Sequence, residues 1–97
     1  MKKIKLDPYD LRILINGLYS CRKTCPPDVR EQIDSILFWL METFEEMKSG
    51  RKKKLAFTTD EKRLVLLCLN EWRNSFLSGS NENKADAVAE TMSKFIR

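Results

Sequence analysis

The sequence predicts an all-α protein, specifically an up-down-up-down four-helix bundle built from two pseudo-repeated helical hairpins. Three observations support this fold class. Charged residues make up 33% of the 97 residues, with only three Gly and three Pro, a composition typical of a helical globule. Apolar residues recur at helical spacing in four segments. The two halves of the chain also carry similar signals in the same order.

The length indicates one domain over residues 1–97, large enough for a single core of modest stability. We expect a first hairpin over about residues 6–47, a basic linker over 48–56 and a second hairpin over about 57–97. The longest uncharged run, 13–21, is too short to span a bilayer. The expectation is therefore a soluble, cytoplasmic protein without a membrane partner.

The first predicted helix covers about residues 8–24. Asp7 is a suitable N-cap, Pro8 suits the first helical position, and Leu6 can pack on Leu11 across the helix start. Gly17 weakens the helix by about 1 kcal/mol relative to Ala and allows a neighbour to approach closely. The expected apolar face consists of Leu11, Leu14, Ile15 and Leu18.

The second predicted helix opens at Pro26 and Pro27 and stops near Gly50. Asp28 and Glu31 suit the positive end of the helix dipole. Its apolar stripe has the clearest helical spacing in the chain, and consists of Val29, Ile33, Ile36, Leu37, Leu40, Phe44 and Met47.

The third and fourth predicted helices form the second hairpin. The third covers about residues 59–77, and Thr58 with Glu61 fits a capping box at its start. A turn at 78–83 leads to the fourth helix. Because the connections are short, consecutive helices should be antiparallel neighbours. The fourth helix is expected to point Ala85, Val88, Ala89, Met92, Phe95 and Ile96 inward.

An internal repeat is the third observation behind the fold class. When the chain is offset by 51 residues, 6–10 align with 57–61, and both segments place an apolar residue before a capping residue and an acidic first turn. Few residues are identical, so the similarity lies mainly in physical role. The aligned pairs include Arg12 with Arg63, Leu18 with Leu69, Arg22 with Arg73, Met41 with Met92, and Phe44 with Phe95.

Residues that carry chemistry are scarce. The chain has no His, the commonest general base, and no Gly-rich phosphate loop. Three Cys, an odd number, argue against a disulfide framework, and Cys21 and Cys25 lack the further ligands that zinc requires. We therefore expect a protein that is not an enzyme, with no catalytic residues, no metal site and no cofactor.

The second helix carries more apolar surface than one stripe needs. Phe38, Trp39 and Met41 lie off its stripe, and Trp72 adds a large aromatic residue to an equally apolar third helix. One interpretation is a wide stripe, with Trp39 packed at its margin. The interpretation we favour is a protein interface made by Phe38, Trp39, Met41 and Trp72, since aromatic and Met residues anchor such contacts. Two copies sharing the second helix would form a homodimer.

Basic residues concentrate in two stretches. Residues 1–5 and 48–54 contribute eight positive charges to a net charge of +4, so the rest of the chain is net negative. An up-down-up-down bundle would gather these stretches at one end as a basic pole. Its expected members are Lys2, Lys3, Lys5, Lys48, Arg51, Lys52, Lys53, Lys54, Lys94 and Arg97.

Two interpretations of the basic pole stay open. In the first, the 48–54 run is a solvated hinge; in the second, the pole contacts phosphate groups or an acidic protein. Acidic residues at the same helix starts (Asp7, Asp10, Asp60 and Glu61) and the lack of interleaved aromatic residues weaken the second interpretation.

The sequence therefore predicts a small non-enzymatic protein–protein interaction protein, an adaptor or inhibitor that self-associates. The aromatic flank of the second helix would form the contact, and the basic pole would steer an acidic partner. The alternative is a nucleic-acid-associated accessory protein that binds phosphate backbone through the basic pole.

Overall fold

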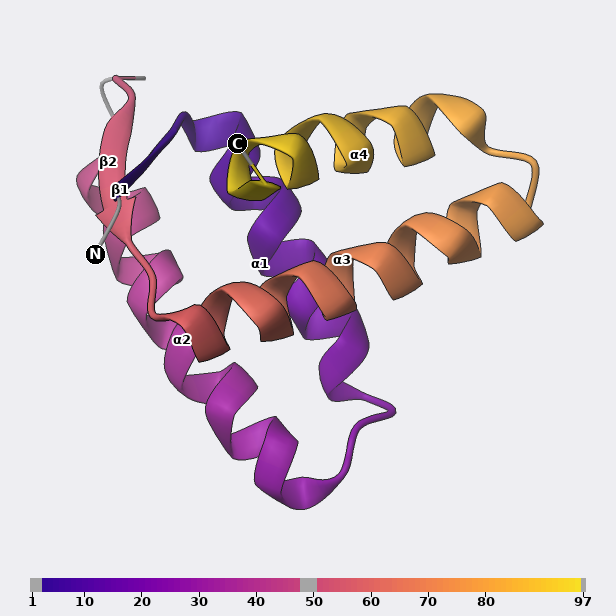
Figure 1. Ribbon diagram of the computed structural model, residues 1–97, viewed down its shortest axis with the longest axis horizontal. Coiled ribbons are helices and arrows are strands. Elements are labelled where there is room, and N and C mark those ends of the chain that lie inside the picture. Colours follow the sequence, from indigo (N-terminus) through magenta and orange to yellow (C-terminus); the bar gives the residue numbers. More distant parts are fainter. Residues whose placement is uncertain (1–2, 48–50, 97) are drawn as a thin grey trace.

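A computed structural model describes residues 3–47 and 51–96 of the chain. The protein is mostly helical, as predicted, with four helices in the described residues (Figure 1). Two short strands, which the sequence analysis did not predict, precede the two pairs of helices. The elements are β1 (Lys3–Leu6), α1 (Pro8–Arg22), α2 (Pro27–Glu46), β2 (Lys53–Ala56), α3 (Thr59–Ser78) and α4 (Glu82–Ile96).

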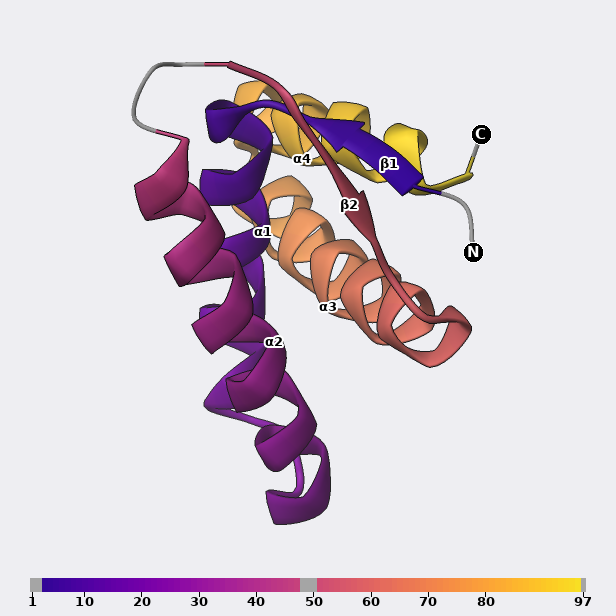
Figure 2. The ribbon, with the colours of Figure 1, turned by 90° about the vertical axis from the view of Figure 1, so that its left-hand side faces the viewer.

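The helices form two antiparallel hairpins, α1 with α2 and α3 with α4. The predicted up-down-up-down order describes each hairpin, but the two hairpins cross instead of running along one axis (Figures 1 and 2). Helix α1 is central because it contacts α2, α3 and α4. No helix among the described residues has both the length and the apolar character needed to span a membrane.

The crossing of α1 and α3 depends on Gly17. A Cβ atom at this position would lie 2.6 Å from Leu69 Cδ2 and 3.2 Å from Trp72 Cε3, both on α3. Gly17 and Leu69 are buried. The close approach that the sequence suggested at Gly17 is therefore confirmed, and the neighbour is the third helix.

Strands β1 and β2 form an antiparallel ribbon (Figure 2). Ile4 pairs with Leu55, and both side chains are buried, whereas Lys5 pairs with Lys54 and both are exposed. This alternation of buried and exposed residues is the period of two expected of a strand. Residues 53–56 of the predicted basic linker are thus paired backbone.

The helix starts have the capping interactions that the sequence indicated. Asp7 caps α1 and Thr58 caps α3. At α3 the Glu61 carboxylate accepts from the Thr58 N–H at 2.7 Å, which completes the predicted capping box. At α1 Asp10 takes the same role for Asp7, an interaction that was not predicted.

The core lies between the two hairpins and beneath the ribbon. Phe57, which directly follows β2, is fully buried, and its ring centroid lies 5.1 Å from those of both Trp39 and Phe95. The predicted inward position of Ile96 is wrong, since this side chain is 72% exposed at the end of α4. The largest fully buried side chains also include Leu6, Leu11, Leu14, Leu18, Ile33, Leu40 and Leu69.

Candidate interaction surfaces

A groove rich in lysine lies where the ribbon meets the start of α3 and the end of α4. Its volume is about 370 Å³. We call it the basic groove, and its lining consists of Lys3, Ile4, Lys5, Lys52, Lys62, Lys94 and Phe95. Ile4 and Phe95 are buried, so their side chains form an apolar floor between the ammonium groups. No acidic residue of the described chain lines the groove.

Most of these lysines lack a partner in the part of the chain that the structure describes. The ammonium groups of Lys3, Lys5, Lys52 and Lys62 make no ion pair or hydrogen bond with another described residue. Lys5 also lies directly across the ribbon from Lys54, and like charges in this position repel each other. The groove therefore presents positive charge that the described residues do not neutralise.

Lys94 is the exception, because a buried carboxylate holds it in place. Its Nζ pairs with Asp10 Oδ2, while the Thr91 hydroxyl donates to Asp10 Oδ1 at 2.8 Å. Burial alone would raise the pKa of Asp10, but hydrogen bonds from Lys94, the Asp7 backbone N–H and Thr91 outweigh it and lower the pKa. Asp10 therefore stays ionised and fixes the end of α4 against the start of α1.

The acidic residues at the helix starts do not reach the basic groove. Asp60 and Glu61 line a separate hollow that also includes Gln32 and Ser35 of α2. The Asp7 carboxylate accepts the Asp10 backbone N–H at 2.7 Å. Of the four acidic residues at the helix starts, only Asp10 pairs with a lysine of the basic groove, and that lysine is Lys94.

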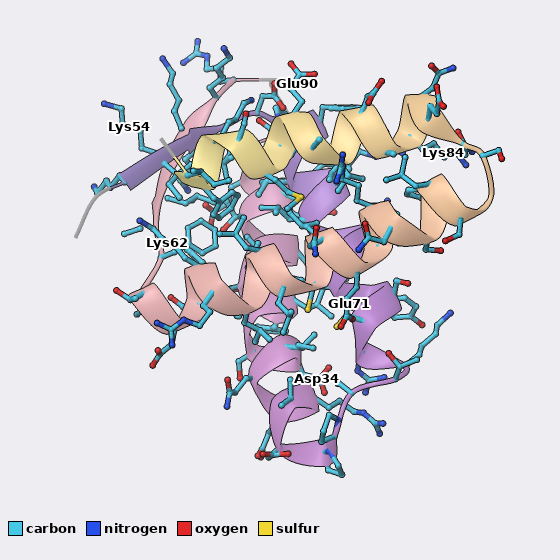
Figure 3. All side chains as sticks on the ribbon, turned by 45° about the vertical axis from the view of Figure 1, so that its right-hand side comes forward. Asp34, Lys54, Lys62, Glu71, Lys84 and Glu90 are labelled. Carbon is cyan, nitrogen blue, oxygen red and sulfur yellow. The ribbon has the colours of Figure 1, made fainter. Side chains whose placement is uncertain are left out.

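The structure brings together part of the predicted basic pole. Lys3, Lys5, Lys52 and Lys94 line the groove, whereas Lys53 pairs with Glu46 of α2 at 2.7 Å. Arg51 and Lys54 are exposed but do not line it, and Figure 3 shows Lys54 directed outward from the ribbon. The predicted members Lys2, Lys48 and Arg97 lie outside the described residues.

Lys62 also lines the groove, although it was not among the predicted members of the basic pole. It lies between α3 and the ribbon in Figure 3. Lys62 is the fourth helical residue after the Thr58 cap, the position whose side chain normally packs back toward the residue before the cap. A lysine at this staple position is the signal that could have placed its ammonium group beside β2.

Of the four predicted interface residues, two are exposed and two are half-buried. Phe38 is 68% exposed and Met41 is 54% exposed, both on α2. Trp39 is half-buried and packs its ring edge-to-face with Phe57. Trp72 is also half-buried, with its ring beside Gly17 and 4.9 Å from that of Phe76. The exposed part of the predicted interface is therefore Phe38 and Met41.

Carboxylates surround Phe38 on the solvent side of α2. At 100° per residue, Glu31, Asp34, Met41 and Glu42 all fall within about 60° of Phe38 around the helix. We call this set with Phe38 the outer face of α2. Asp34 pairs with Arg22 of α1, but the exposed carboxylates of Glu31 and Glu42 have no partner among the described residues. The outer face is thus an apolar centre within an acidic border.

Two of the three cysteines, Cys21 and Cys68, lie together at a site that shares no residue with the basic groove. Cys21 and Cys68 line a hollow of about 230 Å³ with Glu71, and Figure 3 shows Glu71 close to sulfur atoms. Burial raises the pKa of both thiols, so they stay protonated. Within the described residues, no three Cys, Asp or Glu side chains are grouped closely enough to hold a metal ion.

Comparison of the chain with protein-family models, with curated proteins and with solved structures finds no match. Function is therefore inferred from the two surfaces described above, the basic groove and the outer face of α2.

Proposed function

We propose that this is a small non-enzymatic interaction protein of the cytoplasm that self-associates, with the outer face of α2 as its main contact surface. The observation that supports the proposal is the exposure of Phe38 and Met41 on the middle of a twenty-residue helix. Protonated, reduced thiols are in keeping with the cytoplasm.

The position of Phe38 favours a contact role over a chance exposure. Phe and Met side chains are enriched at the centres of protein interfaces, where they displace water. Phe38 is flanked on α2 by the core residues Leu37 and Leu40, so its backbone is fixed before binding. A pre-organised aromatic side chain loses little entropy when it is covered.

Phe38→Glu is expected to weaken self-association at least tenfold without loss of helix. The substitution removes the apolar area that the Phe38 ring would bury in the contact. It also places a carboxylate there, which would have to lose its hydration when the contact forms. Light scattering over a range of protein concentrations measures the association, and circular dichroism checks the helix content.

Leu77→Glu is the matched control for Phe38→Glu. Leu77 is also exposed, at 42%, but it lies at the end of α3, far from α2 (Figure 1). It should associate like the wild type. Equal masses for the wild type and Phe38→Glu at every concentration would contradict the role of this surface.

The second candidate is a nucleic-acid-associated accessory protein, which the unpartnered lysines of the basic groove favour. Binding to labelled single- and double-stranded oligonucleotides, followed by fluorescence anisotropy, should then weaken steeply with salt. Lys5→Gln with Lys62→Gln should lower the affinity and reduce the slope of log affinity against log salt by about two units. Absence of binding at low salt, where electrostatic attraction is strongest, would eliminate this candidate.

We also propose that the chain arose from two copies of one strand–helix–helix unit that fold together as one domain. The order β1, α1, α2 is repeated as β2, α3, α4. The aligned residues Leu6 and Phe57, and Leu18 and Leu69, are all fully buried. Each strand needs its counterpart to complete the ribbon, which supports joint folding of the two units.

A further inference from the structure

The outer face of α2 is poorly suited to pair with itself. In an antiparallel pair centred on Phe38, Glu42 of one copy would face Asp34 of the other, about 6 Å from the centre at 1.5 Å per residue. In a parallel pair Glu31 would face Glu31, and Glu42 would face Glu42. Because like charges brought together at an interface repel each other, a homodimer that shares α2 is disfavoured.

We propose instead that the outer face of α2 docks onto the basic groove of a second copy of this chain. The inference rests on the self-association proposed above and names the surface that Phe38 meets. Glu31 and Glu42 would approach the ammonium groups of the groove, and Phe38 would cover the apolar parts of the surrounding side chains.

Charge complementarity selects this partner. The Glu31 and Glu42 carboxylates have no partner among residues 3–47 and 51–96, and neither do the ammonium groups of Lys3, Lys5, Lys52 and Lys62. Opposite charges that are unpaired in the free protein gain the most from association, and they raise the association rate at low salt.

The two surfaces lie on different sides of the molecule. In Figure 2, β1 and the end of α4, which border the basic groove, lie on the opposite side of α1 from the upper part of α2, and no described residue of α2 lines the groove. One copy cannot bring its own α2 onto its own groove. Each copy instead offers one α2 face and one groove, so the contact is heterologous, and it extends into longer assemblies unless two copies satisfy each other.

Charge reversal of one surface at a time tests the pairing. The face variant carries Glu31→Lys and Glu42→Lys, and the groove variant carries Lys5→Glu and Lys52→Glu. All four side chains are exposed, so the helix content should match the wild type by circular dichroism.

A third variant serves as the control for the face variant. It carries Glu82→Lys and Asp86→Lys, at exposed positions near the start of α4, and has the same net charge as the face variant.

Sedimentation velocity at low salt gives the decisive result. Each charge-reversed variant alone should be monomeric at concentrations where the wild type and the control associate, with at least a tenfold weaker association. An equimolar mixture of the two variants should associate again, since the groove variant keeps its α2 face and the face variant keeps its groove.

Two results would overturn the inference, and they differ in what else they exclude. A groove variant that associates like the wild type, while the face variant does not, would show that α2 pairs with another surface and would leave self-association standing. A wild type that is monomeric throughout would remove both the inference and the proposed self-association.

Discussion

Asp10→Ala is expected to lower the free energy of unfolding by about 3 kcal/mol. About 1 kcal/mol comes from the lost capping box, and about 2 kcal/mol comes from leaving Lys94 and Thr91 without their acceptor in a part-buried site. The Asp10 side chain is only 3% exposed. It accepts the Asp7 N–H in the capping box, and it also binds Lys94 and Thr91. Urea unfolding followed by circular dichroism measures the change.

Asp7→Ala is the control that separates the two contributions. It removes the cap of α1 but leaves the pairing of Asp10 with Lys94, so its cost should be about 1 kcal/mol. Equal costs for the two substitutions would contradict the role of Asp10 as the link between α1 and α4.

The pH dependence of stability offers a second readout for Asp10. Its pKa in the folded state is lowered from the usual value of 3.8, so its contribution is fully present above that value and is lost as the pH falls through the folded pKa. The wild type should therefore lose more stability than Asp10→Ala when the pH is lowered from about 5 to about 2.

Gly17→Val is expected to destabilise the protein by about 3 kcal/mol, the upper end of the usual cost of overpacking a core. Even the first added carbon would lie 2.6 Å from Leu69, which is fully buried and has little room to move. Relief would require Leu69 to repack within the core or α1 and α3 to separate. Thermal unfolding should show the loss as a lower transition temperature.

Gly79→Val provides the comparison for Gly17→Val. A Cβ at Gly79 would meet only backbone oxygens at 3.7 and 3.8 Å, and its φ of −88° suits any residue. The cost there should be at most about 1 kcal/mol, as for a surface position. If both variants were equally stable, the crossing would not depend on close approach at Gly17.

Local signals in the sequence predicted the helices well. The caps Asp7 and Thr58, the Pro26-Pro27 break and the turn after α3 each act over a few residues, so they are readable without the fold. The start of α1 at Pro8 and the start of α3 at Thr59 agree with prediction.

The ribbon and the hairpin crossing required non-local information. Strand β1 pairs with a strand some fifty residues later, and each has four residues, too few for a firm periodic signal. The alternation of Lys3, Ile4, Lys5 and Leu6 was the available hint. The crossing follows from the meeting of Gly17 with Leu69, which no spacing along one helix reveals.

The candidate surfaces were predicted only in part, for the same reason. Composition located the basic residues, but their grouping depends on which side of α3 and the ribbon each side chain faces. Lys62 joins the groove, whereas Lys53 turns to Glu46. Similarly, the apolar run of α2 contained both Phe38 and Trp39, and only packing against Phe57 distinguishes the half-buried ring from the exposed one.

The mass of the wild-type protein in solution, measured at one concentration while salt is raised, tests the central claim most directly. Self-association through the acidic border of α2 and the basic groove predicts a mass above that of the monomer at low salt. The mass should fall toward the monomer value as the screening length shrinks from about 30 Å at 0.01 M to about 3 Å at 1 M salt. A monomer at low salt, at every concentration tested, would contradict the account.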